Sequence, residues 1–227
     1  NFTIKFIISF LLTLLIASLL IIQPDIGQIL LIGFSWIILI FISGINLLFL
    51  ITILFIGIAL LLYTTFYIAK FEYIKNRLLS FFDTENGTHN FQSDKALDSI
   101  TSGGFFGKGI GEGVLKNKVP EAHTDYIISV ISEEFGVIAI ILILVLFLVF
   151  AYSIFKKVSM ESDSKIKLIL VGCVSLILLQ AMIHIGVNIR LFPTTGMTLP
   201  FLSYGGSSII SISILSGIIL NLTKRRV

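Results

Sequence analysis

The feature that most constrains this chain is a series of six apolar blocks, each about twenty residues long and almost free of charge. The blocks run over residues 4–22, 26–45, 47–69, 136–155, 168–189 and 203–222. A helix needs about 20 apolar residues to cross the ~30 Å hydrocarbon core of a bilayer. Backbone that faces lipid must be helical or part of a closed barrel, and these blocks are not the short alternating segments of a barrel. The sequence therefore predicts an all-α fold, a polytopic transmembrane helical bundle with six spans.

The distribution of positive charge predicts how this bundle is oriented. The net charge is +3. If the six spans alternate in direction, one side of the membrane receives Lys5, Lys156, Lys157, Lys165, Lys167, Lys224, Arg225 and Arg226. Short basic loops stay in the cytoplasm, so this side and the C-terminus are expected there. Residues 70–135 then form a large extracytoplasmic loop. Because the basic residues belong to the topology, they argue against a nucleic-acid partner.

We expect a single membrane domain over residues 1–227. The chain begins at Asn1 rather than at Met and is apolar from Phe2 onwards. We therefore expect a fragment that lacks its own N-terminus, and a cleaved signal peptide explains the first span less well. The single cysteine, Cys173, lies inside the fifth block, where a small buried apolar residue is the simplest interpretation.

The loop over residues 70–135 has three parts. Residues 71–82 place apolar side chains on one helical face, which predicts an amphipathic helix at the membrane interface. A polar turn follows over residues 83–94. Residues 102–113 are rich in glycine, which lets backbone amides approach an anion closely, and Lys108 adds a charge that suits phosphate. A phosphate contact and a flexible connection are both open interpretations of this last part.

The polar run PEAHTDY over residues 120–126 stands just before the fourth block. Charge at the edge of a membrane span is costly and is more often functional than incidental. We expect Asp125 in the first turn of a helix, with Thr124 as its cap. Asp125 is then either an acid that favours the helix N-terminus or a general base. His123 either orients or moves protons or bonds a loop carbonyl.

Further polar residues lie within and after the fifth block. His184 and Asn188 share a helical face, and interhelical hydrogen bonding is the simpler interpretation of both. Arg190 could reach lipid head groups or grip a diphosphate through its planar fork. Residues 192–208 contain two prolines and three glycines, and such broken backbone persists at membrane depth only within protein or along a cavity. Ser207 either bonds a neighbouring helix or contacts a ligand.

Several motifs, in order along the chain, resemble the SEDS family (shape, elongation, division and sporulation), whose FtsW/RodA-type members are peptidoglycan polymerases. They are QPDIG at 23–27, the glycine-rich loop at 103–111, PEAHTDY at 120–126, EEFG at 133–136 and the proline–glycine segment at 192–208. Two positions depart from the family pattern. Thr84 follows Asp83 where the family has proline, and Tyr126 replaces the commoner Phe.

The resemblance implies a ten-span protein whose fifth to tenth spans correspond to the six blocks. The family's large extracytoplasmic loop, between spans seven and eight, corresponds to residues 70–135. Residues 111–113 and 120–123 are more similar to the division-type than to the elongation-type members. The implied location is the bacterial cytoplasmic membrane.

The resemblance also implies a glycosyltransferase that polymerises lipid II on the outer face of the membrane and releases undecaprenyl diphosphate. Asp125 corresponds to the family's catalytic aspartate. Lys108, Lys116 and Arg190 are the candidate cations for the diphosphate. The other candidate substrate contacts are Glu121, His123 and Ser207.

Two rival functions stay open from the sequence: a flippase for the lipid-linked precursor, whose transport path would also need polar groups at membrane depth, and a non-catalytic scaffold. In each case the resemblance implies a class B penicillin-binding protein as partner. No cofactor is evident. A divalent cation could assist at the diphosphate, although the sequence shows no dedicated ligand cluster.

Overall fold

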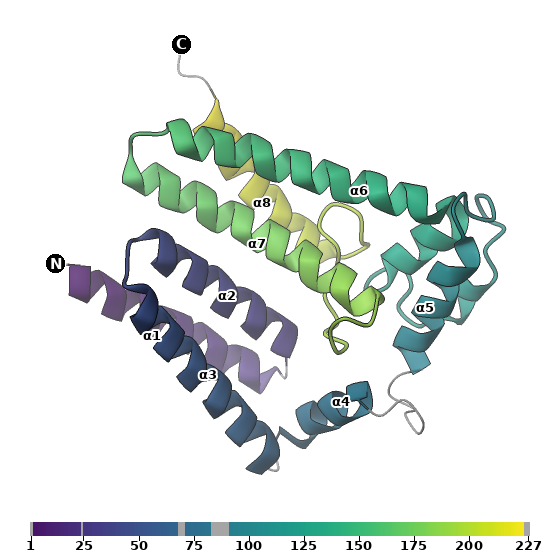
Figure 1. The fold of residues 1–227 in the computed structure, drawn as a ribbon, viewed down its shortest axis with the longest axis horizontal. Helices are drawn as coiled ribbons and strands as arrows, with labels where there is room; N and C mark the ends of the chain where they lie inside the picture. Colours follow the sequence, from purple (N-terminus) through teal and green to yellow (C-terminus); the bar gives the residue numbers. More distant parts are fainter. Residues whose placement is uncertain (1, 24, 68–70, 83–90, 225–227) are drawn as a thin grey trace.

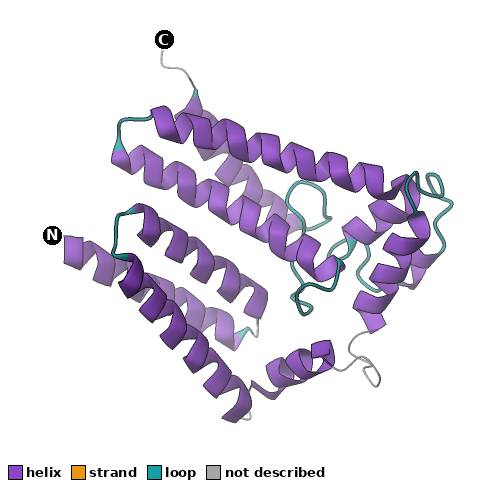
Figure 2. Ribbon diagram, in the orientation of Figure 1, coloured by secondary structure: helices purple, strands orange, loops and turns teal. Residues whose placement is uncertain are grey.

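The computed structural model describes residues 2–23, 25–67, 71–82 and 91–224, and within these ranges it contains helices and loops with no β-strand (Figure 2). The elements are α1 (Phe2–Ile22), α2 (Ile26–Ile42), α3 (Leu47–Tyr67), α4 (Glu72–Phe82), α5 (Phe91–Gly103), η3 (Leu115–Lys118), α6 (Ile127–Met160), α7 (Ser164–Asn188) and α8 (Gly206–Thr223). Most of the polar turn expected over residues 83–94 lies outside the described residues, as do Arg225 and Arg226.

Five helices, α1, α3, α6, α7 and α8, are long and apolar enough to cross a membrane. The sixth, α2, is apolar but has 17 residues, at the lower limit of a span. It ends at Ile42, before the end expected at residue 45, because Gly44 turns the chain with a φ of 86°, which glycine adopts without a steric penalty. The chain is an integral membrane protein, and the predicted all-α, polytopic bundle is confirmed.

Helix α6 begins at Ile127 rather than near residue 136, where the apolar block starts. A kink at Gly136, with φ of 77° and ψ of −178°, divides the helix. A side chain at Gly136 would collide with the backbone of Phe105 and Gly107. The segment before the kink therefore packs with α5 and η3 of the loop over residues 70–135, and the segment after it is the membrane span.

Helix α7 is the centre of the bundle and packs against α2, α6 and α8 (Figure 1). Its side chains Leu170, Val174 and Ile177 form the main core with Ile154 of α6 and Ile212 of α8. Cys173 is buried in the same core and forms no disulfide, as expected.

The two ends of the bundle differ in composition. The start of α1, the α2–α3 and α6–α7 turns and the end of α8 lie at one end, whereas α4 and α5 lie at the other (Figure 1). The first end carries Lys5, Lys156, Lys157, Lys165, Lys167 and Lys224. The second end gathers the motif segments around residues 25, 125 and 190–205, and it holds the candidate site.

Candidate functional site

The segment before α6 forms a tight turn around Glu121, whose φ of 54° is left-handed. The Glu121 carbonyl accepts hydrogen bonds from the backbone amides of Thr124 and Asp125, at 3.1 and 3.0 Å. Tyr126 occupies the N-cap of α6, and Thr124 donates instead to the Glu121 carboxylate at 2.9 Å. The expectation that Asp125 lies in the first helical turn with Thr124 as cap is wrong, because this turn takes up the local amides and delays the helix to Ile127.

Two other parts of the chain hold Asp125 in place through the backbone. Asn188, at the end of α7, donates to the Asp125 carbonyl at 3.0 Å. Ser203 donates to the Thr124 carbonyl at 2.7 Å, and the Tyr204 amide donates to the His123 carbonyl at 3.0 Å. The contacts leave the Asp125 carboxyl beside Gly196, where an added Cβ would lie 3.5 Å from Oδ2.

The Asp125 carboxyl is half-buried, and its pKa is raised above the ordinary value of an aspartate. Burial is the main cause, and the neighbouring Glu121 carboxylate raises the pKa further because two negative charges repel each other. Asp25, at the N-cap of α2, adds a smaller effect in the same direction. A carboxylate with a raised pKa is better matched to accepting a proton near neutral pH.

Arg77 of α4 is a cation that the structure brings to this site, and sequence reasoning missed it. Its guanidinium donates to the Thr194 carbonyl at 3.3 Å and lowers the pKa of Asp125. The sequence places Arg77 on the polar face of an amphipathic helix, but it does not show which segment that face contacts. The available signal was topological, since residues 25, 77 and 125 all fall at the same end of the alternating spans.

Glu133 organises the glycine-rich loop. Its fully buried carboxylate accepts hydrogen bonds from the Ser99 hydroxyl and from the amides of Val114 and Leu115, each at 3.0 Å. The Lys108 ammonium lies 3.2 Å from the same carboxylate. Lys108 therefore lies in a structural ion pair, and its predicted contact with a diphosphate stays a prediction.

The glycines of this loop allow close contact with α6. A Cβ at Gly103 would collide with the backbone of Ser132, and one at Gly107, whose φ is 76°, with the backbone of Glu134. The amides of Lys108 and Gly109 donate to the carbonyls at positions 133 and 134, at 2.9 and 3.0 Å. The segment is thus packed on α6 rather than loosely held, and a phosphate contact by this loop stays a prediction.

The remaining candidate residues lie around this centre. Arg190, with a φ of 56°, pairs with Asp94 of α5 at 2.6 Å. The His123 side chain is exposed, as are Glu121 and Ser207. The side chain of Lys116, in η3, lies outside the described part of the chain. The roles of these residues in substrate binding stay predictions.

His184 and Asn188 form a buried polar pair. His184 Nδ1 lies 2.7 Å from the Met197 carbonyl, and Nε2 lies 3.3 Å from the Asn188 amide. The expected hydrogen bonding is present, but the partners outside α7 are backbone carbonyls of loops rather than side chains of another helix. The pair therefore ties the loop after α7 to the segment that holds Asp125.

These features define a class of protein: a helical membrane bundle in which α4 and three loop segments, around residues 25, 125 and 192–205, assemble a carboxylate site at one end. Residues 1–227 match the model of the FtsW/RodA/SpoVE family, described as cell cycle protein, and the chain belongs to this family.

Relatives of this chain carry the name probable peptidoglycan glycosyltransferase FtsW. The protein of Caulobacter vibrioides is 36% identical over 96% of this chain and 55% of its own length. That of Trichlorobacter lovleyi is 34% identical over 92% of this chain and 55% of its own length. The chain thus spans about half the length of the curated relatives it matches.

A solved structure also matches the fold. It is described as showing the structural coordination of polymerization and crosslinking by a peptidoglycan synthase complex. The TM-score is 0.72 at 28% identity, over 94% of this chain and 59% of the solved chain.

Proposed function

We propose that this chain is part of a peptidoglycan glycosyltransferase that polymerises lipid II, with Asp125 as general base. The observation that carries the proposal is the half-buried Asp125 carboxyl with its raised pKa, held between α7 and the 192–205 loop and faced by Arg77. The names of the relatives support the same activity, and their division-type name favours that subtype. We also propose that residues 1–227 form a single membrane domain.

In the proposed reaction a sugar hydroxyl of the acceptor attacks the anomeric carbon of the donor glycan chain. A new carbon–oxygen bond forms, the bond to the diphosphate breaks, and undecaprenyl diphosphate leaves with the electron pair. Asp125 accepts the hydroxyl proton, which makes the attacking oxygen a better nucleophile. Arg77 offsets negative charge on the departing diphosphate.

The other cations differ from Arg77 in what already holds them. Lys108 and Arg190 are engaged by Glu133 and Asp94, so each would have to leave a carboxylate to reach the diphosphate. Lys116, Glu121, His123 and Ser207 remain candidate contacts for the sugar and diphosphate groups. A divalent cation at the diphosphate stays an option of the same proposal.

The proposed orientation puts the Asp125 end on the outer face of the bacterial cytoplasmic membrane and the basic end in the cytoplasm. The separation of the short basic turns from the site supports it, because short loops rich in Lys and Arg stay inside. We also propose a class B penicillin-binding protein as partner. The support is that the solved relative belongs to a complex described by both polymerization and crosslinking.

The test is Asp125→Asn in the full-length protein, reconstituted with lipid II and its partner. We expect polymer formation to fall by about 10²–10⁴-fold, because an amide cannot accept the proton, while folding and membrane insertion are kept. Asp98→Asn, an exposed acid of α5 paired with Lys95, is the matched control. Near-normal polymerisation by Asp125→Asn would contradict the proposal and favour a flippase or a scaffold.

A further inference from the structure

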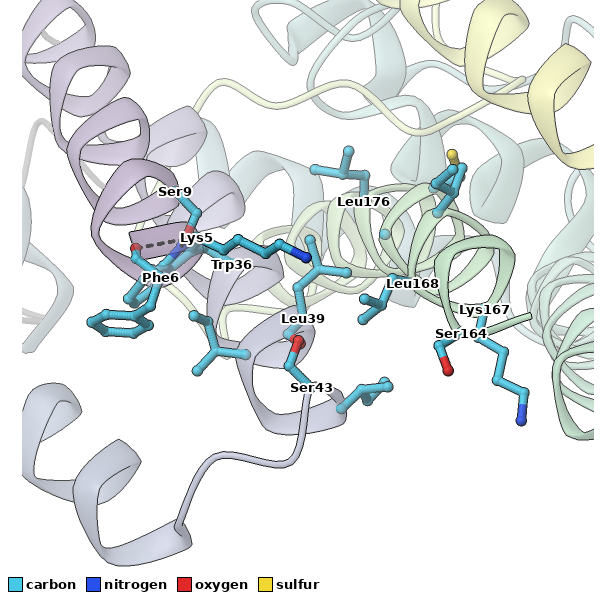
Figure 3. Close-up of a pocket in the computed structure, with 15 residues that line it drawn as sticks. Lys5, Phe6, Ser9, Trp36, Leu39, Ser43, Ser164, Lys167, Leu168 and Leu176 are labelled. Carbon is cyan, nitrogen blue, oxygen red and sulfur yellow. Dashed lines mark hydrogen bonds between the residues drawn. The ribbon is translucent and has the colours of Figure 1, made fainter. Parts of the chain in front are cut away.

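A groove between α1, α2 and α7 lies at the basic end of the bundle, opposite the Asp125 site. Its volume is about 900 Å³, in the upper part of the 300–1,000 Å³ range of ligand sites. Most of its lining is apolar, including Trp36, Leu39 and Leu168 (Figure 3). None of the residues proposed for polymerisation lines it, so the groove needs an explanation of its own.

The length of the groove matches one leaflet of a membrane. Its lining on α7 runs from Ser164 to Leu176, which corresponds to about 18 Å of helix. This is little more than half of the ~30 Å hydrocarbon core. A transmembrane helix would need the whole thickness, whereas the acyl chain of a lipid needs one half.

The polar end of the groove carries two lysines, Lys5 of α1 and Lys167 of α7. Figure 3 shows Lys5 reaching from α1 towards α7, and Lys167 extending beside Ser164 at the end where α7 begins. Among the described residues, neither ammonium forms an ion pair, although Lys167 is half-buried. Two unpaired cations at the open end of an apolar groove favour an anionic ligand with an apolar tail.

Carboxylates near this end are held by the backbone of the α6–α7 turn. Glu161 accepts hydrogen bonds from the amides of Ser162 and Asp163, at 2.9 and 3.1 Å. Asp163 caps α7 by accepting from the Lys165 amide at 2.8 Å. Neither acid lines the groove, so the lysines are the charges that a ligand there would meet first.

We propose that this groove binds one phospholipid with an anionic head group. Its acyl chains lie along α2 and α7, and its phosphate lies between Lys5 and Lys167. The lipid comes from the leaflet at the basic end, the inner leaflet in the proposed orientation. The inference does not depend on the proposed glycosyltransferase activity.

Trp36 provides a direct test, because it lines the groove and its indole Nε1 donates to Ser9 at 3.3 Å. The full-length protein is placed in nanodiscs that contain brominated phosphatidylglycerol or brominated phosphatidylcholine, since bromine quenches tryptophan fluorescence on contact. The signal of Trp36 is the difference between the protein and its Trp36→Phe variant. We expect quenching at a lower mole fraction of the anionic lipid.

The charge requirement is tested with the double variant Lys5→Gln, Lys167→Gln. The preference for the anionic lipid should fall by about fivefold for each lysine removed. The matched control is Lys156→Gln, Lys157→Gln, which changes the same charge at the same end outside the groove and should keep the preference. Three outcomes would overturn the proposal. The first is equal quenching by the two lipids, and the second is a preference that survives in the Lys5, Lys167 variant. The third is no quenching at all, because another part of the full-length protein fills the groove.

Discussion

Two carboxyl groups eight residues apart, Asp125 and Glu133, show how the loop over residues 70–135 uses the same chemical group in two ways. Glu133 is fully buried and meets a lysine, a hydroxyl and two backbone amides. Asp125 is held through its backbone, and its half-buried carboxyl faces Glu121 and Asp25 as well as Arg77. The donors around Glu133 stabilise its charge, whereas the surroundings of Asp125 make its charge costly.

The difference indicates which carboxyl group is structural and which is available for chemistry. A buried charge with several donors is satisfied and rigid, so Glu133 holds the glycine-rich loop against α6. A carboxyl with a raised pKa in a partly open site is a candidate for proton transfer. The variants below test this division of roles.

The largest expected loss of stability comes from Glu133→Ala. It leaves buried amides and the Lys108 charge without their acceptor, which costs about 3–5 kcal/mol for a buried pair. The partial exposure of Lys108 moves the value towards the lower end. Thermal unfolding of the full-length protein in detergent measures the loss, with exposed Glu112→Ala as a control that should stay within about 0.5 kcal/mol. A Glu133→Ala variant as stable as this control would show that the glycine-rich loop does not depend on Glu133.

Gly107→Ala tests whether the loop is packed on α6 as tightly as the Glu133 contacts suggest. Its left-handed φ of 76° costs a side chain about 1–2 kcal/mol, and the collision with the Glu134 backbone adds to this. Gly104→Ala is the matched control, because Gly104 also has a positive φ, 58°, but open space around it. Unfolding measurements should show a clearly lower stability for Gly107→Ala than for Gly104→Ala. Equal losses of stability would mean that the close approach of Gly107 to the Glu134 backbone is unimportant.

The pH dependence of polymerisation tests whether Asp125 is the general base. A base acts only when it is ionised, so the acid limb of the rate follows the pKa of Asp125. Removing a cation that lowers this pKa, as in Arg77→Gln, should move the limb to higher pH. Removing a carboxylate that raises it, as in Glu121→Gln, should move the limb to lower pH. Rate profiles of both variants measure the shifts, and shifts in the same direction would argue against Asp125 as the titrating group.

The smallest effect is expected for the Arg190–Asp94 pair, which is partly exposed. Each single change to alanine should cost at most about 1 kcal/mol of stability, and the two losses should not be additive because the residues are in contact. The rate of polymerisation distinguishes between a diphosphate contact and a structural ion pair as the role of Arg190. If it grips the diphosphate, Arg190→Ala lowers the rate while Asp94→Ala does not, whereas equal effects indicate a purely structural pair.

Much of the architecture could be predicted from the sequence, because its causes are local. The length of an apolar block decides whether a helix can span a bilayer, and this identified the helical bundle. The Asp25 cap of α2 has an equally local cause, because the Gln28 amide three residues later donates to its carboxylate at 3.0 Å. Both depend on residues within a few positions of each other, so a pattern in the sequence is enough to find them.

Only the tertiary structure decided how the site is built. The left-handed turn at Glu121 places Asp125 outside α6, against the pattern-based expectation. The contacts of Lys108 with Glu133, and of Arg77 with the Asp125 surroundings, join residues 25 or more positions apart. Each of these side chains had several possible partners in the sequence. The packing of α4, α5 and the 192–205 loop on the bundle selected one of them. The physical reason is that burial leaves a charge stable only where a matching group is already in place.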